Sequence, residues 1–234
     1  MTEPLTLIDQ PSPNFDARPD GVAIDHLVLH YTGMKTGHAA LDRLCDPVAK
    51  VSSHYLVEED GRIFRLVDES RRAWHAGVAS WRGAKNINAR SIGIEIVSPG
   101  HEHGYRDFPS VQIEAVISLC RDILSRHTIP NAHIVGHSDI APWRKEDPGE
   151  LFPWAELAAA GIGAWPVADI SAPDPTPSDS IRQLNQIGYL TEEPSSVTLA
   201  TTAFQRRFRP TDIAGTLDDD TRALIARYAK ALST

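Results

Sequence analysis

The proline-rich segment Gly161–Asp179 (GIGAWPVADISAPDPTPSD) constrains the fold of this chain more than any other feature. It has no sustained helical period, and its prolines favour an extended, semi-stiff spacer because proline fixes its own backbone. A chain of 234 residues suits one medium domain with an appendage. The sequence therefore predicts a first domain over residues 1–163, a linker over 164–177 and a second domain over 178–234.

Strand-like and helix-like patterns alternate before this segment. Short aliphatic and β-branched runs predict strands at Asp25–His30, His54–Val57, Arg62–Val67, Ser91–Val97 and Ala132–Val135. The tight-turn pair Asp60-Gly61 makes the second and third of these a hairpin. Apolar residues at helical spacing over Val111–His127 predict an amphipathic helix. The fold class that follows is α/β, with a mixed central β-sheet flanked by helices.

Three short helical patterns follow the linker. Ile181, Leu184 and Ile187 share one helix face, and Gly188 supplies a stop. The stretch VTLATTAFQRRF (197–208) has a similar face, and Thr216 followed by Asp219 resembles a capping box before a third helix. These patterns predict a small all-α domain of three helices at the C-terminus.

Charge and composition limit the kinds of partner that this protein can bind. A net charge of −8, without any long run of Lys or Arg, argues against general binding to nucleic acid or to an anionic membrane. The least polar long stretch, Leu151–Ala168, contains Glu156 and two prolines, so we expect no membrane insertion. The first 21 residues lack the basic start and apolar core of a signal peptide. We therefore expect a cytoplasmic protein, or a periplasmic one if a signal segment preceded residue 1.

Two histidines end apolar strands. His30 ends the first predicted strand, and His137 follows the last one in the segment GHSDIAPWRKEDPGELF. If those strands are neighbours, both imidazoles reach one metal ion at about 2.0–2.1 Å, and Asp147 in the same segment supplies a third ligand. Two imidazoles and one carboxylate leave a fourth position for water, as in catalytic zinc sites. The alternative is that these are scattered residues of no joint role, since His and Asp are common.

Two further residues join this hypothesis. Glu95 interrupts an otherwise apolar strand, on the face opposite the isoleucines, where a charge is costly unless it lines a site or points to solvent. Within reach of a zinc-bound water, its carboxylate would accept a proton. Lys145 lies two residues before Asp147, and its ammonium either stabilises an oxyanion or is an ordinary exposed loop charge.

Five colinear motifs resemble the zinc-dependent N-acetylmuramoyl-L-alanine amidases, a family that includes bacterial peptidoglycan-recycling amidases, phage amidases and peptidoglycan recognition proteins. They cover most of residues 22–152. The motifs are LVLHYTG, VSSHYLVEEDGRIFRLV, RAWHAGVASWRG, NINARSIGIEIV and VGHSDIAPWRKEDPG. The C-terminal unit, with QLNQIGY, TTAFQRRFRP and GTLDDDTRALI, resembles a peptidoglycan-binding three-helix module.

The resemblance implies a role for each matching residue. Zn²⁺ would be held by His30, His137 and Asp147, with Glu95 as base and Lys145 stabilising the transition state. The motifs also imply substrate contacts at Trp74, His75, Tyr31 and Asn86, and a supporting position next to the ligands for His54. An aspartate as third ligand resembles the bacterial enzymes, whereas several phage and animal relatives have cysteine there.

The activity implied is hydrolysis of the amide between the lactyl group of N-acetylmuramic acid, expected in its 1,6-anhydro form, and L-alanine of the stem peptide. Peptidoglycan fragments would be the partners, and the setting would be peptidoglycan recycling. The alternatives are a periplasmic amidase acting on intact peptidoglycan, a zinc peptidase that cuts the stem peptide, and a non-catalytic peptidoglycan receptor. The receptor is disfavoured because such proteins lose a zinc ligand, and here the set is complete.

Overall fold

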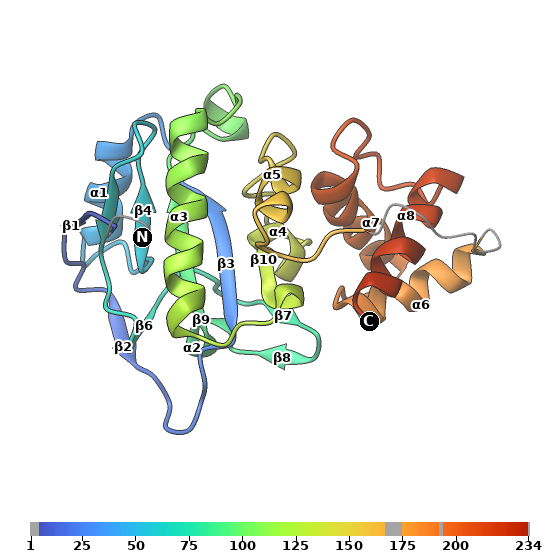
Figure 1. The fold of residues 1–234 in the computed structure, drawn as a ribbon, viewed down its shortest axis with the longest axis horizontal. Helices are drawn as coiled ribbons and strands as arrows, with labels where there is room; N and C mark the ends of the chain where they lie inside the picture. The colour runs from blue at the N-terminus through green and yellow to red at the C-terminus, as the bar shows by residue number, and fades with distance from the viewer. Residues whose placement is uncertain (1–4, 167–174, 192–193, 234) are drawn as a thin grey trace.

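The computed structural model describes residues 5–166, 175–191 and 194–233. A six-stranded sheet in the order β1-β5-β4-β9-β3-β10 forms its centre (Figure 1). Its strands are β1 (Leu7–Asp9), β3 (His26–Tyr31), β4 (Tyr55–Val57), β5 (Ile63–Arg65), β9 (Ser91–Ile96) and β10 (Ile134–Gly136). Two-stranded ribbons pair β2 (Phe15–Ala17) with β6 (Arg71–Ala73), and β7 (Ser80–Trp81) with β8 (Ala84–Lys85). The mixed sheet expected from the sequence is confirmed.

Strand pairing brings distant segments together at one end of the sheet. β3 pairs in parallel with both β9 and β10, so the three strands end on the same side. The register places His30 opposite Glu95 and Val28 opposite Gly93. β4 and β5 are antiparallel, which confirms the hairpin. The last predicted strand is shorter than expected, because residues 131–133 form a 3-10 turn before β10.

The two faces of the sheet pack against different helices. Helix α3 (Ser110–Arg126) lies across one face, where Ile92, Ile94 and Ile96 pack with its apolar side, including Val116 (Figure 1). The burial of this isoleucine face leaves Gly93 and Glu95 on the opposite face, as alternation along a strand requires. On that side α1 (Gly37–Cys45) packs over β4 and β5. The remaining short helices of this part are α2 (Ile87–Arg90), α4 (His137–Ile140) and α5 (Trp154–Ala159).

The three expected C-terminal helices are present as α6 (Pro177–Ile187), α7 (Pro194–Phe208) and α8 (Asp219–Ala231). Gly188 ends α6 with φ +138°, and a Cβ there would lie 2.9 Å from the Trp81 ring, so glycine suits the position on both counts. The capping residue of α8 is Asp218, whose side chain accepts from the Thr221 amide. The prediction that Thr216 caps this helix was wrong, because Thr216 lies two residues before the actual cap. No described helix has the length and apolar character needed to cross a bilayer.

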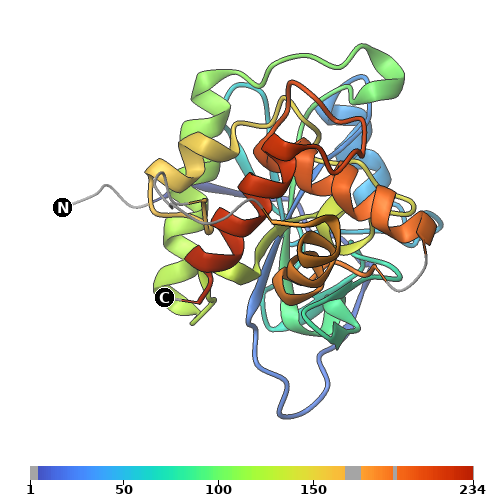
Figure 2. The ribbon, with the colours of Figure 1, turned by 90° about the vertical axis from the view of Figure 1, so that its right-hand side faces the viewer.

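The C-terminal helices share a core with the sheet domain. Leu184 and Phe204 belong to the same buried cluster as Val28, Val135 and Ile140. Figure 2 shows these helices in front of the sheet domain and against it. Residues 167–174 of the expected linker lie outside the described residues, and the boundaries of the two domains stay a prediction.

A buried ion pair joins the two parts. Arg207 of α7 donates to Asp139 of α4 at 2.9 Å, with both side chains at most 3% exposed. Tyr189 donates to the other Asp139 oxygen at 2.6 Å, and the Arg207 guanidinium lies 4.0 Å from the centre of the Trp154 ring. Asp139 also accepts from the Gly136 amide, which fixes the first turn of α4. Asp139 thus connects the C-terminal helices to the turn that begins at His137.

Replacing Arg207 with methionine is expected to lower the free energy of unfolding by about 3–5 kcal/mol, because it leaves a buried carboxylate without its counter-charge. Chemical denaturation of the full chain measures this loss. The control is Arg182→Met, which breaks an exposed ion pair on α6 and is expected to cost at most about 1 kcal/mol. Equal effects of the two substitutions would contradict the prediction.

Candidate active site

Three potential ligand atoms converge at the ends of β3 and β10. His30 Nδ1 lies 2.9 Å from His137 Nδ1 and 3.0 Å from Asp147 Oδ2, and the third side of the triangle, His137 Nδ1 to Asp147 Oδ2, is 3.1 Å. All three residues are buried. The fold thus brings together the three residues that the sequence analysis selected as possible metal ligands.

Hydrogen bonds determine which ring nitrogens carry protons. His30 Nε2 lies 3.0 Å from His75 Nδ1, His75 Nε2 lies 3.1 Å from Ser91 Oγ, and Ser91 donates to the Ile87 carbonyl. This chain is consistent if His30 donates to His75 and His75 donates to Ser91. His137 Nε2 lies 3.2 Å from the Ala76 carbonyl, which can only accept, and 3.2 Å from Arg144 Nη2, which can only donate. His30 Nδ1 therefore directs a lone pair toward His137 and Asp147, and His137 Nδ1 does the same when its Nε2 donates to Ala76.

Three potential ligand atoms so close together could hold a cation between them. Burial and the neighbouring His137 lower the pKa of His30 to about 4, so its ring is neutral at pH 7. Tetrahedral zinc ligands at 2.0–2.1 Å stand about 3.3 Å from one another, close to the observed triangle. The residues present fit a divalent metal ion.

The local fold explains why the three ligands meet. Adjacent parallel strands deliver His30 and His137 to the same edge, and α4 begins at His137. The loop that follows returns to this point, because the Ser138 amide donates to the Asp147 carbonyl at 2.8 Å. Gly93 permits the close approach of His75, since a Cβ at position 93 would lie 2.5 Å from its ring.

Glu95 faces the same pocket from β9. Its Oε2 is buried and has no hydrogen-bond partner within the described part of the chain. Burial and the nearby Asp147 raise the pKa of Glu95 well above its ordinary value, while Lys145 acts against them. A carboxylate with a free oxygen and an elevated pKa beside a metal site suits a general base.

Lys145 lines the pocket and is exposed, and its ammonium forms no ion pair with any described residue. The adjacent Arg144 is used differently: its guanidinium donates to the Val78 and Ala76 carbonyls and so holds the segment that carries His75. Of these two neighbouring cations, Lys145 alone is free to meet charge that develops on a substrate.

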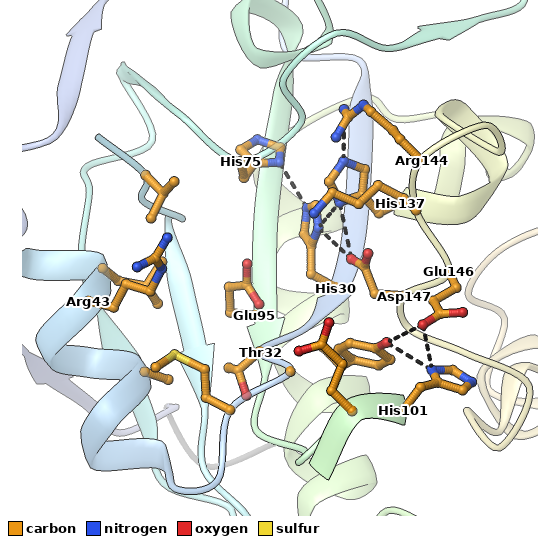
Figure 3. A pocket seen from close by; sticks show the side chains of 18 of the residues that line it. His30, Thr32, Arg43, His75, Glu95, His101, His137, Arg144, Glu146 and Asp147 are labelled. Atoms are coloured by element: carbon orange, nitrogen blue, oxygen red, sulfur yellow. Dashed lines mark hydrogen bonds and ion pairs between the residues drawn. The ribbon is translucent and has the colours of Figure 1, made fainter. Parts of the chain in front are cut away.

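The pocket around these residues has a volume of about 590 Å³ (Figure 3). Tyr31, Trp74 and His75, expected to contact substrate, all line it. Asn86 does not: its left-handed turn, with φ +51°, directs the side chain to Arg72 at 3.2 Å. The structure thus places this predicted substrate contact outside the pocket wall.

His54 is fully buried behind His75 and touches none of the three ligands. Its Nδ1 accepts from the Gly93 amide at 2.9 Å, and its Nε2 lies 3.1 Å from the Arg71 carbonyl. Burial, together with the Arg18 guanidinium, lowers the pKa of His54 to about 3. His54 therefore supports β9 at Gly93, beneath His75. The sequence placed it next to the metal ligands, but in the structure His75 lies between His54 and His30.

Sequence reasoning missed two residues that hold this site. The Asn88 side chain accepts from the amides of both His75 and Ala76, at 3.2 and 2.7 Å, and Ser91 orients the His75 ring. Neither residue carries a signal of its own in the sequence.

A second group, Asp25, His26 and His133, also has metal-ligand composition. There, however, Arg90 donates to both oxygens of Asp25, so a cation already neutralises the carboxylate. His26 and His133 stack with ring centres 4.3 Å apart. This network ties the start of β3 to its neighbours.

The fold and the buried His-His-Asp site define a metal-dependent amidase, and the chain belongs to the N-acetylmuramoyl-L-alanine amidase family, whose model matches residues 20–150. It is 40% identical over 222 residues to the N-acetylmuramoyl-L-alanine amidase AmiD of Escherichia coli K12, covering 85% of this chain and 79% of that protein. It is 35% identical to the 1,6-anhydro-N-acetylmuramyl-L-alanine amidase AmpD of Citrobacter freundii, over 64% of this chain and 87% of AmpD.

Solved structures agree over almost the whole chain. The complex of E. coli AmiD with anhydro-N-acetylmuramic acid-L-Ala-D-gamma-Glu-L-Lys superposes with a TM-score of 0.79 and 37% identity, covering 91% of both chains. AmpDh3 of Pseudomonas aeruginosa, in complex with anhydromuramic pentapeptide, gives 0.81 and 34%, covering 93% of this chain and 95% of that one. The likeness therefore includes the C-terminal helices.

Proposed function

We propose that this protein hydrolyses the amide between the lactyl group of 1,6-anhydro-N-acetylmuramic acid and L-alanine, with Zn²⁺ as its metal. The observation that carries the proposal is the convergence of three potential ligand atoms in the pocket that also holds the unpaired Glu95 oxygen. Relatives solved with anhydro-muropeptides support the substrate class. The complete ligand set also argues against a receptor without catalytic activity.

Each residue has a distinct part in this reaction. His30, His137 and Asp147 would hold the metal, which when bound lowers the pKa of a water to about 7 and polarises a carbonyl. Glu95 takes the proton of the attacking water and passes it to the nitrogen of the leaving L-alanine. Lys145 meets the negative charge that develops on the lactyl oxygen. His75 orients the His30 ring, and the Ala76 carbonyl with Arg144 orients the His137 ring, so that both Nδ1 atoms face the metal position.

Zinc suits this donor set better than other common ions. Magnesium and calcium prefer oxygen ligands, whereas two imidazoles and one carboxylate with an open position are typical of catalytic zinc. Elemental analysis of protein purified without added metal identifies the ion.

A role in peptidoglycan recycling and a cytoplasmic location remain predictions, and cell fractionation tests the second. The function itself is tested by offering anhydro-muropeptides, reducing-end muropeptides and intact sacculi side by side, with mass spectrometry of the products. We expect release of a free stem peptide, fastest from the anhydro-muropeptide. Cleavage inside the stem peptide would indicate a peptidase instead. Equal cleavage of all three substrates would contradict a dedicated recycling role and favour an amidase of the intact wall.

A further inference from the structure

Arg18 is a half-buried cation that has no part in the proposed reaction. It directly follows β2, and its guanidinium forms no ion pair with any described residue. Its hydrogen bonds go to four main-chain carbonyls: Glu69 at 2.8 Å, Asn88 at 3.3 Å, Ala89 at 2.9 Å and Ser91 at 2.8 Å. Burial lowers the pKa of Arg18 to about 10, so the guanidinium stays charged at pH 7. A charge withdrawn from water is costly unless hydrogen bonds compensate for it, and here they tie β2 to two other segments.

The guanidinium also approaches His54, whose Nε2 lies 3.0 Å from Arg18 Nη2. The His54 Nδ1 accepts from the Gly93 amide, so Nε2 carries the hydrogen of this neutral ring and directs it to the Arg71 carbonyl. Two donors therefore face each other at this point, and the contact is not a hydrogen bond. The four carbonyls hold Arg18 in place.

Helix α2 depends on hydrogen bonds that come from outside the helix. It has four residues, and the last four carbonyls of a helix find no partner within it. The structure supplies these partners: the Ser91 hydroxyl for Ile87, Arg18 for Asn88 and Ala89, and the Asp25 amide for Arg90. Arg18 thus serves two carbonyls of α2, and it also binds the carbonyl of Ser91, where β9 begins.

Two of the residues whose carbonyls Arg18 binds also hold His75 through their side chains. The Asn88 side chain accepts from the His75 amide at 3.2 Å, and the Ser91 hydroxyl lies 3.1 Å from His75 Nε2. His75 Nδ1 in turn lies 3.0 Å from His30 Nε2, a contact that Figure 3 shows beside the other ligands. A displacement of α2 would therefore move both supports of His75 at once.

We propose that Arg18 is a positioning residue of the metal site, which acts through α2 and His75 to keep the His30 ring in its ligand orientation; this inference rests on the metal site of the proposed function. A partner that orients a metal-binding histidine changes metal affinity by roughly 10–100-fold when it is removed. Arg18 acts one step further out than such a partner. Lysine cannot replace it, because an ammonium lacks the planar fork that reaches several carbonyls at once.

Arg18→Ala is expected to weaken Zn²⁺ binding by the full chain about tenfold, measured by competition with a chromophoric chelator in the absence of substrate. Added guanidinium ion, at a concentration too low to unfold the protein, should restore most of the lost affinity. The matched control is Arg222→Ala. Arg222 is also half-buried and donates to two carbonyls, those of Pro175 and Leu217, but it does not line the pocket. Its replacement should leave the Zn²⁺ affinity unchanged.

Nitrogen NMR of the histidine rings in the metal-free protein needs neither Zn²⁺ nor turnover. In the wild type we expect His30 and His75 to carry their hydrogen on Nε2, and in Arg18→Ala we expect a mixture of tautomers. If the wild type binds no Zn²⁺, the proposed function fails, and the tautomers still decide the role of Arg18. If Arg18→Ala does not fold, Arg18→Lys carries both measurements. Wild-type tautomers in the variant, or an equal loss of affinity in Arg222→Ala, would overturn the proposal.

Discussion

Glu95→Gln is expected to lower kcat by about 10²–10⁴-fold while the protein keeps its metal. The amide has the size of the carboxylate but cannot accept a proton, so it removes the base without removing the side chain. Glu95 lies opposite His30 in the β3–β9 register, but it does not belong to the group of three possible ligands, His30, His137 and Asp147. Its substitution should therefore leave metal binding intact. Steady-state rates and elemental analysis of the same preparation measure the two effects together.

The control for this substitution is Glu114→Gln on the exposed side of α3, which we expect to leave both the rate and the metal content unchanged. If Glu95→Gln instead loses its metal, the carboxylate is a ligand and its role as base is wrong. A rate within a few-fold of the wild type would remove Glu95 from the mechanism altogether.

Asp147→Asn is expected to weaken metal binding by at least roughly a hundredfold and to reduce turnover accordingly. The substitution keeps the shape but removes the one negative charge among the ligands, and the two imidazoles alone hold a divalent ion poorly. Competition with a chromophoric chelator measures the affinity in the absence of substrate. For the wild-type protein, chelation should abolish turnover and added Zn²⁺ should restore it.

Asp122→Asn, at a partly exposed position on α3 that does not line the pocket, serves as the matched control and should bind metal normally. Full activity of the metal-free wild-type protein would rule out a metal-dependent mechanism. Unchanged affinity in Asp147→Asn would mean that the converging triangle is a hydrogen-bond network and not a ligand set.

Local pattern predicted five strands of the central sheet, while β1 and the two short ribbons were not predicted, and the ligand set came from the family resemblance. Alternation in Ser91–Ile96 separates an isoleucine face from a face with Gly93 and Glu95, and the structure follows that division. The hairpin around Asp60-Gly61 is similarly local. The start of α8 was misplaced because two capping candidates, Thr216 and Asp218, lie close together, and only the Asp218 side chain reaches a free amide.

The roles of His75 and Asn86 could not be read in the same way. Both follow from the backbone between β6 and β9, where a left-handed turn directs Asn86 to Arg72 while Asn88 holds the His75 amide. Sequence spacing does not show that Asn86 bonds to Arg72 while Asn88, two residues on, holds the His75 amide.

The sequence by itself determined the chemistry available to this protein: the ligand types, the carboxylate on an apolar strand, and the three C-terminal helices. These depend on residue type and on periods of two or four residues, which are local properties. Only the tertiary structure decided that His30 and Asp147, separated by 117 residues, meet at one point, and that α7 binds α4 through an ion pair spanning 68 residues. Such contacts depend on how strands pair and helices pack, and this information is not contained in any single segment.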